Sequence, residues 1–415
     1  MSKEKIVVGI DVGSSSVKVV VAEQPKGQGI PINILGGVET PTFGISRGAI
    51  TSIDDVTSSI STAIDRAERS IGLPIERAWI GISGITTMTQ LNRGVVAVSH
   101  QDQEIRMEDV ERAVEAAKTN PIPNYEILHI IPRCYIVDGV TVQDPVGMTG
   151  IRLEVEAYVI QVLQSWQRNL RQCVHRANVE IDDVSLGVLP ASDALLTQRQ
   201  KELGVALVNI GASSTSVMIF ENGEIKDVAV LPIGSLHITT DLMRVLKIPL
   251  EVAETLKLHF GTAAVKTIGK KEEINLYDVG HTEEELVSKK KIAEIIEARV
   301  EEIFEKINTQ VFKKNNCVGK LPAGIVLTGG GAKLPGLVEI GKREANMAVA
   351  VGYPFNFSSY TDTLHDPAYG TAIGLVGWAA DTQMRGVGSA MGQKFSLHFI
   401  SGMKKGLRDW IRGIF

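Results

Sequence analysis

The sequence predicts an α/β protein built from two related lobes. Three observations support this fold class. The chain has 415 residues, too many for one compact core. A glycine- and serine-rich hairpin pattern occurs twice, once in each half. Strand-like and helix-like segments alternate after each copy, which favours sheets covered by helices on both faces.

The first hairpin is predicted in Ile6–Ala22, IVVGIDVGSSSVKVVVA. Two runs of branched apolar residues flank a turn that consists of Gly13, Ser14, Ser15 and Ser16. Tight turns of small residues leave backbone N–H groups free to point at an anion, and serine hydroxyls add further donors. The hairpin therefore indicates a phosphate-binding loop.

A second copy of this pattern occurs in Val205–Phe220, VALVNIGASSTSVMIF. Asn209 lies 198 residues after Asp11, and the same offset aligns the glycine and serines of the two turns: Gly13 with Gly211, Ser15 with Ser213 and Ser16 with Ser214. One such hairpin is a weak signal. A second copy one domain length later predicts a duplicated fold.

The segments between the motifs show the expected alternation of apolar periods. Helices are predicted around 56–71, from about Met107, over 165–178, after Gly234 and over about 291–312. Strands are predicted at 77–82, 94–98, 127–131, 133–137 and 151–162. Residues 266–291 are charged and weakly patterned, so we expect an exposed hairpin or a mobile insertion there.

A third motif lies in Ala323–Leu337, AGIVLTGGGAKLPGL, where an apolar strand ends in three glycines. We expect a helix to follow. Residues without side chains let a purine and its ribose approach the backbone closely, so Gly329, Gly330, Gly331 and the nearby Lys333 are candidate nucleoside contacts. The spacing is neither that of a Walker loop nor that of the dinucleotide fingerprint.

Together the two hairpins form a candidate site for a polyphosphate. Asp11 ends the first strand and can hold the hydration shell of Mg²⁺, which binds few protein groups directly, and Lys18 can neutralise phosphate charge. No direct metal ligand is predicted, because the eight histidines show no paired spacing. The candidate phosphate and magnesium residues are Asp11, Gly13, Ser14, Ser15, Ser16, Lys18, Asn209, Gly211, Ala212, Ser213, Ser214 and Thr215.

These three motifs, in this order, resemble the phosphate-1, phosphate-2 and adenosine motifs of the actin, Hsp70 and sugar-kinase superfamily. Over nearly its whole length the chain is similar to the FtsA family of bacterial cell division proteins. The matching stretches include LHIIPRCYIVDG from Leu128, DPVGMTGIRLEV from Asp144 and DPAYGTAIGLV from Asp366. The resemblance implies an actin-like (ribonuclease H-like) fold that binds ATP and Mg²⁺. It also implies that Glu254 and Lys257, in AETLKLHFGTA, contact the nucleoside.

The resemblance further implies a domain plan. The first lobe would comprise 1–83 and 163–204, interrupted by an FtsA-type small interaction domain at 84–162. The second lobe would cover 205–380, with a subdomain at about 236–308. A flexible linker, 381–399, would lead to an amphipathic membrane-targeting helix, 400–415. The small-residue composition of 381–393 independently suggests that linker.

Two departures from the family pattern predict very slow ATP turnover. Asn209 stands where the family usually has aspartate, and asparagine lacks the charge that helps to order the hydration shell of the metal. Ala212, Ser213 and Ser214 replace a run of glycines. Near the helical segment from about Ser192, no glutamine or glutamate is placed to orient an attacking water. We therefore predict ATP binding with weak or no ATPase activity, and no catalytic residue is identified.

The last residues, ISGMKKGLRDWIRGIF from Ile400, have the pattern of a helix that lies on a membrane surface. The apolar face and the terminal plug consist of Met403, Leu407, Trp410, Ile411, Ile414 and Phe415. The cations that would meet anionic lipids are Lys404, Lys405, Arg408 and Arg412. The alternative is a terminal helix docked on the protein's own core.

Composition narrows the remaining possibilities. The formal net charge is −5 and the basic residues of the small domain lack aromatic partners, so nucleic-acid binding is not expected. Three isolated cysteines suggest a reducing compartment without disulfides. We expect no signal peptide, and no uninterrupted apolar run reaches about 18 residues.

By resemblance, the protein polymerises and tethers the tail of the tubulin-like protein FtsZ to the cytoplasmic face of the inner membrane at the septum. FtsZ would dock on about 236–308, and the small domain would contact transmembrane division proteins. A PilM-like adaptor of pilus assembly is the alternative, because NIGASST resembles that branch. A sugar kinase would need a catalytic aspartate in the cleft, and a chaperone would need a further peptide-binding domain.

Overall fold

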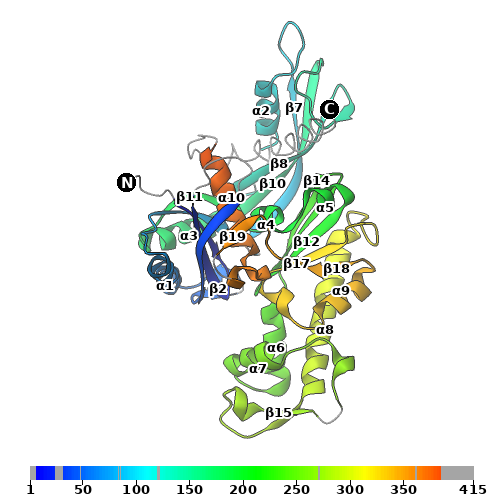
Figure 1. Cartoon of the computed structure of the whole chain (residues 1–415). Coiled ribbons are helices and arrows are strands. Elements are labelled where there is room, and N and C mark those ends of the chain that lie inside the picture. Colours follow the sequence, from blue (N-terminus) through cyan, green and yellow to red (C-terminus); the bar gives the residue numbers. More distant parts are fainter. Residues whose placement is uncertain are drawn as a thin grey trace.

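A computed structural model gives the fold of the chain and describes residues 6–23, 31–46, 48–82, 84, 86–118, 122–269, 272–359 and 362–384. The molecule is elongated (Figure 1): two sheet-based lobes lie side by side in the middle, a small domain lies at one end, and a mostly helical subdomain lies at the other. The candidate membrane helix and most of the predicted linker lie outside the described residues.

The first lobe is built on a six-stranded sheet with the order β11-β6-β1-β2-β3-β19. Its strands are β1 (Ile6–Val12), β2 (Ser16–Glu23), β3 (Ile32–Pro41), β6 (Arg77–Ile82), β11 (Glu180–Leu186) and β19 (Phe357–Ser359). Helices α1 (Ile53–Ile71) and α3 (Gln164–Arg176) pack together on one face of the sheet, while α4 (Val188–Leu195) and α10 (Gly370–Met384) pack together on the other. A short hairpin, β4 (Ile45–Ser46) with β5 (Ala49–Ile50), precedes α1.

The second lobe contains a five-stranded sheet with the order β14-β13-β12-β17-β18. Its strands are β12 (Val205–Ile210), β13 (Thr215–Glu221), β14 (Glu224–Leu231), β17 (Ile325–Thr328) and β18 (Val349–Val351). Its helices are α5 (Gln198–Leu203), α6 (Ser235–Leu246), α7 (Leu250–Phe260), α8 (Lys289–Ile307) and α9 (Leu337–Ala345). Helix α4 contacts β12 and β13 as well as α10, so it lies between the two sheets.

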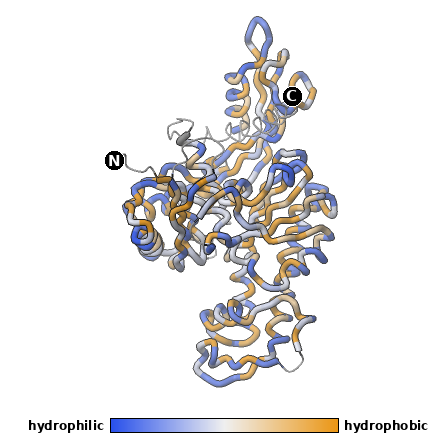
Figure 2. The backbone as a smooth tube through the Cα atoms, in the orientation of Figure 1, coloured by the Kyte–Doolittle hydropathy of each residue, from blue (hydrophilic) through white to orange (hydrophobic). Residues whose placement is uncertain are grey.

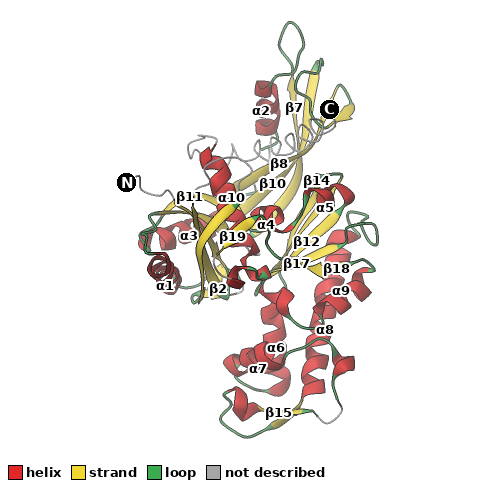
Figure 3. Ribbon diagram, viewed as in Figure 1, coloured by secondary structure: helices red, strands yellow, loops and turns green. Residues whose placement is uncertain are grey.

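The two central sheets repeat one topology, which agrees with the predicted duplication. In each, three strands run antiparallel (β3-β2-β1 and β14-β13-β12), and two parallel strands follow (β6-β11 and β17-β18). Figure 3 shows these strands side by side in the middle of the molecule. Both sheets are apolar along most of their strands, whereas the loops and outer helices carry the hydrophilic residues (Figure 2). Buried residues of both sheets join one core around α4 and α10.

The small domain is a four-stranded antiparallel sheet with one helix on it. The sheet has the order β7-β10-β8-β9, with β7 (Thr87–Ala97), β8 (Tyr125–Val137), β9 (Val140–Val142) and β10 (Arg152–Leu163). Helix α2 (Met107–Ala116) packs against β7 so closely that a Cβ on Gly94 would lie 2.0 Å from the carbonyl oxygen of Ala113. The absence of a side chain at Gly94 therefore sets the distance between helix and sheet.

Hydrogen bonds join the small domain to both lobes. The backbone N–H of Leu186, at the end of β11, donates to Nε2 of the buried His129 at 3.1 Å. Burial lowers the pKa of His129 to about 3, so the imidazole stays neutral and able to accept. The hydroxyl of Tyr158 donates to the backbone carbonyl of Lys226 in β14. The small domain thus contacts both halves of the duplicated fold.

Several predicted elements need correction. We expected separate strands at 127–131 and 133–137, but β8 is continuous through Pro132. Proline has no N–H to donate, and a β-bulge at Arg133 shifts the register there, so that the strand continues past it. The predicted strand at 94–98 is the end of the longer β7. The helix predicted to reach residue 312 ends as α-helix at Ile307 and continues as a π-helical turn, Asn308–Phe312. After the glycine motif, a 3₁₀ turn (Gly330–Lys333) precedes α9.

The segment 266–291 contains the predicted hairpin but is not simply exposed. Strands β15 (Glu273–Asn275) and β16 (Leu286–Ser288) pair antiparallel on either side of a 3₁₀ turn, Leu276–Val279. Ile274, Leu276 and Val287 are buried in the same core as α6, α7 and α8. The few apolar residues are spaced too irregularly for periodicity to reveal this packing.

We predicted that residues 205–380 form the second lobe, but the last strand and helix of this range pack on the first lobe. β19 pairs with β3, and α10 packs on β1. Both contacts are between residues more than 300 positions apart, which local sequence patterns do not report. α10 continues to Met384, so the first four residues of the predicted linker are helical. Among the described residues, no helix is both long and apolar enough to cross a membrane.

Two glycines of α10 test the packing between α10 and α4. A Cβ on Gly374 would lie 2.1 Å from the carbonyl oxygen of Pro190, whereas a Cβ on Gly377 would make only ordinary contact, at 3.7 Å. We expect Gly374→Ala to lower the free energy of unfolding by about 1–3 kcal/mol through overpacking. Gly377→Ala in the same helix should raise it by about 0.5–1 kcal/mol, because alanine favours helix. Denaturant titration of both variants measures the difference; equal effects would contradict the close contact.

Candidate nucleotide cleft

A polar cleft lies between the two lobes where their hairpin turns face each other. Its walls come from the first hairpin, the second hairpin, the glycine motif and the start of α10. The lining residues are Asp11, Gly13, Ser14, Ser15, Ser16, Lys18, Glu39, Asn209, Gly211, Ala212, Ser213, Ser214, Ser235, Thr328, Gly329, Gly330, Pro367, Ala368 and Thr371. All but one of the predicted phosphate residues line this cleft; Thr215 is the exception.

The two turns have the same backbone geometry. The N–H of Gly13 donates to the carbonyl oxygen of Ser16 at 3.1 Å, and the N–H of Gly211 donates to that of Ser214 at 2.9 Å. The strand register repeats as well, because Asp11 faces Lys18 across the first hairpin as Asn209 faces Ser216 across the second. The duplication therefore preserves the turn and changes the charged pair into a neutral one.

Lys18 is held by polar groups of the first lobe. Its Nζ donates to the hydroxyl of Ser16 at 2.6 Å and lies 3.2 Å from a carboxylate oxygen of Glu39. Lys18 is buried, whereas the Glu39 side chain is half-exposed at the mouth of the cleft. Burial opposes ionisation of Glu39, but Lys18 and the Ser16 hydroxyl outweigh it and lower the pKa of that carboxyl.

Asp11 carries an enclosed carboxylate oxygen. Its Oδ1 is covered and has no hydrogen-bond partner among the residues that the structure describes. Burial raises the pKa of Asp11 to about 6, although Lys18 partly offsets this shift. A buried acceptor without a partner costs free energy. Asp11 therefore fits the carboxylate that a hydrated Mg²⁺ requires, and a hydrated ion would satisfy the oxygen.

The opposite wall offers a second unsatisfied group. Oγ of the buried Ser213 has no hydrogen-bond partner within the described part of the chain. Thr215, by contrast, points away from the cleft, since its hydroxyl donates to the backbone carbonyl of Ile233 at 2.7 Å. Ser213 is thus available to a ligand, and Thr215 instead fixes the base of the turn.

Helix α6 begins directly behind the second turn. The N–H groups of Ser235 and Leu236 donate to the carbonyl oxygens of Gly211 and Ala212 at 2.9 and 2.8 Å. A Cβ on Gly234 would lie 2.5 Å from the Gly211 oxygen, so this close approach requires glycine. The positive end of a twelve-residue helix therefore adjoins the phosphate turn, which favours an anion there.

The three glycines of the third motif have different reasons to be glycine. Gly329 has a φ of 84°, and a Cβ on it would lie 2.3 Å from Oδ1 of Asn209. A Cβ on Gly331 would lie 2.5 Å from the side chain of Ile210. Only Gly330 borders open space, with nothing within 4 Å of a Cβ built on it. Of the three, Gly330 is therefore the one that a purine could approach closely. Gly329 and Gly331 lack side chains because they pack against β12.

The remaining predicted nucleoside residues do not line the cleft. Lys333 pairs with Asp366 at 2.6 Å. Lys257 lies 2.7 Å from Glu254 and donates to Thr239 at 3.0 Å, so these three side chains satisfy one another between α6 and α7. Their role as nucleoside contacts stays a prediction.

Sequence reasoning missed six lining residues: Glu39, Ser235, Thr328, Pro367, Ala368 and Thr371. Glu39 enters the site only through the pairing of β3 with β2, in which it faces Lys18. Thr328 donates to the carbonyl oxygen of Pro367 at 2.7 Å and so attaches the glycine motif to the start of α10. Of these six residues, Ser235 alone follows a local sequence pattern, because it stands directly after Gly234 at the start of a predicted helix.

The described residues contain no cluster of three or more histidine, cysteine or acidic side chains that could hold a metal ion on its own. The cleft contributes two carboxylates, Asp11 and Glu39, and one amide, Asn209. This donor set fits Mg²⁺ held through water and phosphate oxygens.

Comparison with known proteins identifies two matching regions. Residues 206–374 match the family described as "Cell division protein FtsA", and residues 84–161 match "SHS2 domain inserted in FTSA". The chain is 33% identical to the cell division protein FtsA of Pseudomonas aeruginosa, over 99% of this chain and 98% of the relative. It is 36% identical to that of Bacillus subtilis over 94% and 88%, and 29% identical to that of Escherichia coli K12 over 98% of each.

Solved structures share the fold at low identity. The PilM–PilN type IV pilus biogenesis complex aligns with a TM-score of 0.64 and 16% identity, covering 90% of this chain and 98% of that chain. MreB5 of Spiroplasma citri bound to ADP aligns with a TM-score of 0.52 and 11% identity, covering 91% and 98%. The fold is the actin-like α/β fold with an inserted SHS2 domain, as the sequence predicted.

The raised pKa of Asp11 makes a prediction about stability. Since folding raises this pKa from 3.8 to about 6, the carboxyl stabilises the fold when protonated, and that contribution is lost as the pH rises through 6. We expect Asp11→Asn to raise the free energy of unfolding of the ligand-free protein by about 3 kcal/mol at pH 8 and by about half of that at pH 5. Denaturant titration at the two pH values measures this; a gain that does not depend on pH, or a loss, would contradict it.

Proposed function

Because the chain belongs to the FtsA family of cell division proteins, we propose that it is an ATP-binding scaffold that polymerises and tethers FtsZ to the inner membrane. The proposal that the protein binds ATP rests on the cleft. Asp11 on one wall and Ser213 on the other each hold a covered polar atom without a partner among the described residues. A polyphosphate with its cation would satisfy both atoms at once.

The cleft supplies a role for each end of ATP. Lys18 and the positive end of α6 would neutralise the phosphates, and backbone N–H groups of the two turns would bind their oxygens. Asp11 would hold water molecules of Mg²⁺. The base would lie toward Gly330, where the backbone borders open space. Two solved structures of MreB5, by their titles bound to ADP and to AMPPNP, share the fold and support the choice of an adenine nucleotide.

We propose that hydrolysis is very slow. The residue of the second lobe that would face the cation is the neutral Asn209, and its Oδ1 adjoins the backbone of Gly329. Helix α4, beside the cleft, is buried and mostly apolar, and Ser192 donates its hydroxyl to the carbonyl oxygen of Leu189. Neither group is suited to orient a water for attack. ATP would therefore stabilise one arrangement of the lobes rather than turn over.

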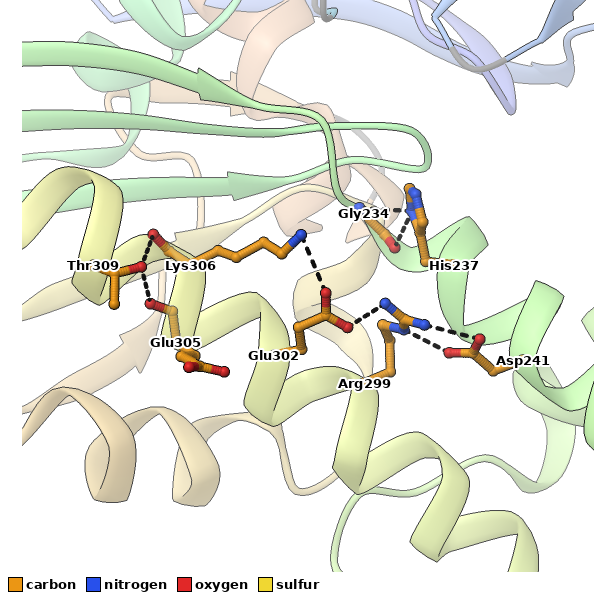
Figure 4. A network of polar contacts seen from close by, with 8 residues as sticks. All are labelled: Gly234, His237, Asp241, Arg299, Glu302, Glu305, Lys306 and Thr309. Carbon is orange, nitrogen blue, oxygen red and sulfur yellow. Dashed lines mark hydrogen bonds and ion pairs between the residues drawn. The ribbon is translucent and has the colours of Figure 1, made fainter.

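The subdomain formed by α6, α7 and α8 is our proposed docking site for the FtsZ tail. Arg299 of α8 binds Asp241 of α6, with Nη2 2.9 Å from Oδ1, and also contacts Glu302, which Lys306 approaches at 3.1 Å (Figure 4). Leu258 of α7 is 68% exposed. A charged network and unburied apolar side chains on one subdomain suit a peptide that carries both kinds of residue.

The far end of the small domain offers a surface for self-association or for transmembrane division proteins. Val140 and Ile151 are exposed there. β9 forms one edge of the four-stranded sheet, so it leaves backbone groups for a partner strand. These features suit the role that the family resemblance implies for this domain.

Attachment to the membrane is assigned to the basic amphipathic segment 403–415, which lies beyond the described residues. This would place the protein on the cytoplasmic face of the inner membrane at the septum. The likeness to the PilM–PilN complex concerns the fold alone at 16% identity. The full-length relatives reported above are division proteins, which favours division over pilus assembly.

ATP binding is tested at Lys18. We expect Lys18→Ala to weaken binding of ATP with Mg²⁺ by about 10- to 100-fold, because a charge-assisted hydrogen bond to phosphate is lost. Lys320→Ala, which removes an exposed lysine that pairs with Asn316 outside the cleft, is the control and should leave the affinity unchanged. Isothermal titration calorimetry measures both variants. An undiminished affinity in Lys18→Ala would refute this role of the cleft.

Tethering is tested by cosedimentation with anionic vesicles and FtsZ, with and without ATP. The intact chain should bring FtsZ to the vesicles, more efficiently with ATP. Truncation after Gln393 should abolish recruitment while leaving ATP binding intact, because the cationic apolar segment is removed. Unchanged vesicle binding by the truncated chain would discard the anchor, and failure of the intact chain under every condition would discard the tether.

A further inference from the structure

Glu39 is an acid of the cleft to which the proposed binding of the phosphates gives no role. It lies on β3, directly opposite Lys18 in the pairing of β2 with β3. Its carboxylate lies 3.2 Å from Lys18 Nζ, and the Ser16 hydroxyl, which Lys18 also contacts, helps to keep the carboxyl ionised. The ligand-free cleft therefore already pairs the lysine intended for phosphate with an acid of the protein.

The charges of the cleft add up to an unfavourable environment for a bare polyphosphate. Among the described lining residues, Asp11 and Glu39 are acidic and Lys18 is the one base. Asn209 contributes no charge. Two carboxylates against one ammonium leave the cleft net negative whenever Asp11 is ionised, and repulsion between like charges is strong in a partly enclosed site.

A cation of the second lobe also acts on Glu39. Burial opposes ionisation of Glu39, but Lys18, Ser16 and, more weakly, the charge of Lys333 on the glycine motif lower the pKa of its carboxyl. Lys333 itself is paired with Asp366 at 2.6 Å. Each cation near Glu39 thus already has an acidic partner, and a phosphate must compete for either one.

We propose that Glu39 makes ATP binding conditional on a divalent cation. It holds Lys18 in the ligand-free cleft and keeps the cleft negative, so that a polyphosphate gains Lys18 only when a bound cation offsets the two carboxylates. Glu39 is then a positioning residue, because it acts through Lys18 and through the cation. This inference rests on the proposed nucleotide cleft.

The test compares ATP affinity in Mg²⁺ and in EDTA by calorimetry on the full-length protein. Glu39→Gln keeps the size of the side chain and removes its charge. We expect it to bind ATP about tenfold more tightly than the wild type in EDTA, but to differ by about threefold or less in Mg²⁺. The ratio of the two affinities, which a merely structural role would not change, therefore shrinks. Glu76→Gln, which neutralises an exposed acid of the same lobe, should keep the wild-type ratio.

A double variant tests whether Glu39 acts through Lys18. In a Lys18→Gln background, Glu39→Gln should change the EDTA affinity less than it does in the wild type, because the pair can no longer form. An unaltered Mg²⁺ dependence in Glu39→Gln, or weaker binding in EDTA, overturns the inference while the nucleotide cleft stands. Absence of ATP binding by the wild type in both buffers overturns the nucleotide cleft and the inference together.

Discussion

The structure depends on one repeated hydrogen bond, from a glycine N–H to the carbonyl oxygen of the serine that closes the turn. It occurs at Gly13 with Ser16 and at Gly211 with Ser214. The bond shapes each turn so that small residues face the gap between the lobes. Because both sheets repeat one strand order, the two turns meet across the cleft. Among the residues that the structure describes, Asp11 and Ser213 of this cleft each carry a covered polar atom without a hydrogen-bond partner.

The lobes are coupled because the end of the described chain crosses between them. The glycine motif belongs to the second sheet, yet Thr328 holds the carbonyl of Pro367, which leads into α10 on the first sheet. Helices α4 and α10 share a core with residues of both sheets. A ligand that draws the two turns together would therefore act on packed elements of both lobes, and α10 leads toward the segment proposed to bind the membrane. This is the physical basis for the proposal that ATP would act as a structural effector.

What could be predicted from sequence is what local patterns encode. The duplicated turns follow from the repeated glycine and serine pattern, and the glycine motif follows from its strand. Glu39 could not be placed, because its approach to Lys18 requires the pairing of β3 with β2 and not a motif. The return of β19 and α10 to the first lobe is a contact between distant segments. Lys257 matched the family pattern but is held by Glu254 and Thr239 outside the cleft lining.

The central claim, that one ligand engages both turns at once, is tested most directly by hydrogen exchange of the backbone amides with and without Mg²⁺–ATP. The account predicts slower exchange on ATP addition in both turns, 13–16 and 211–214, with the same dependence on ATP concentration. Slower exchange in one turn alone, or in neither turn at saturating ATP, would contradict it.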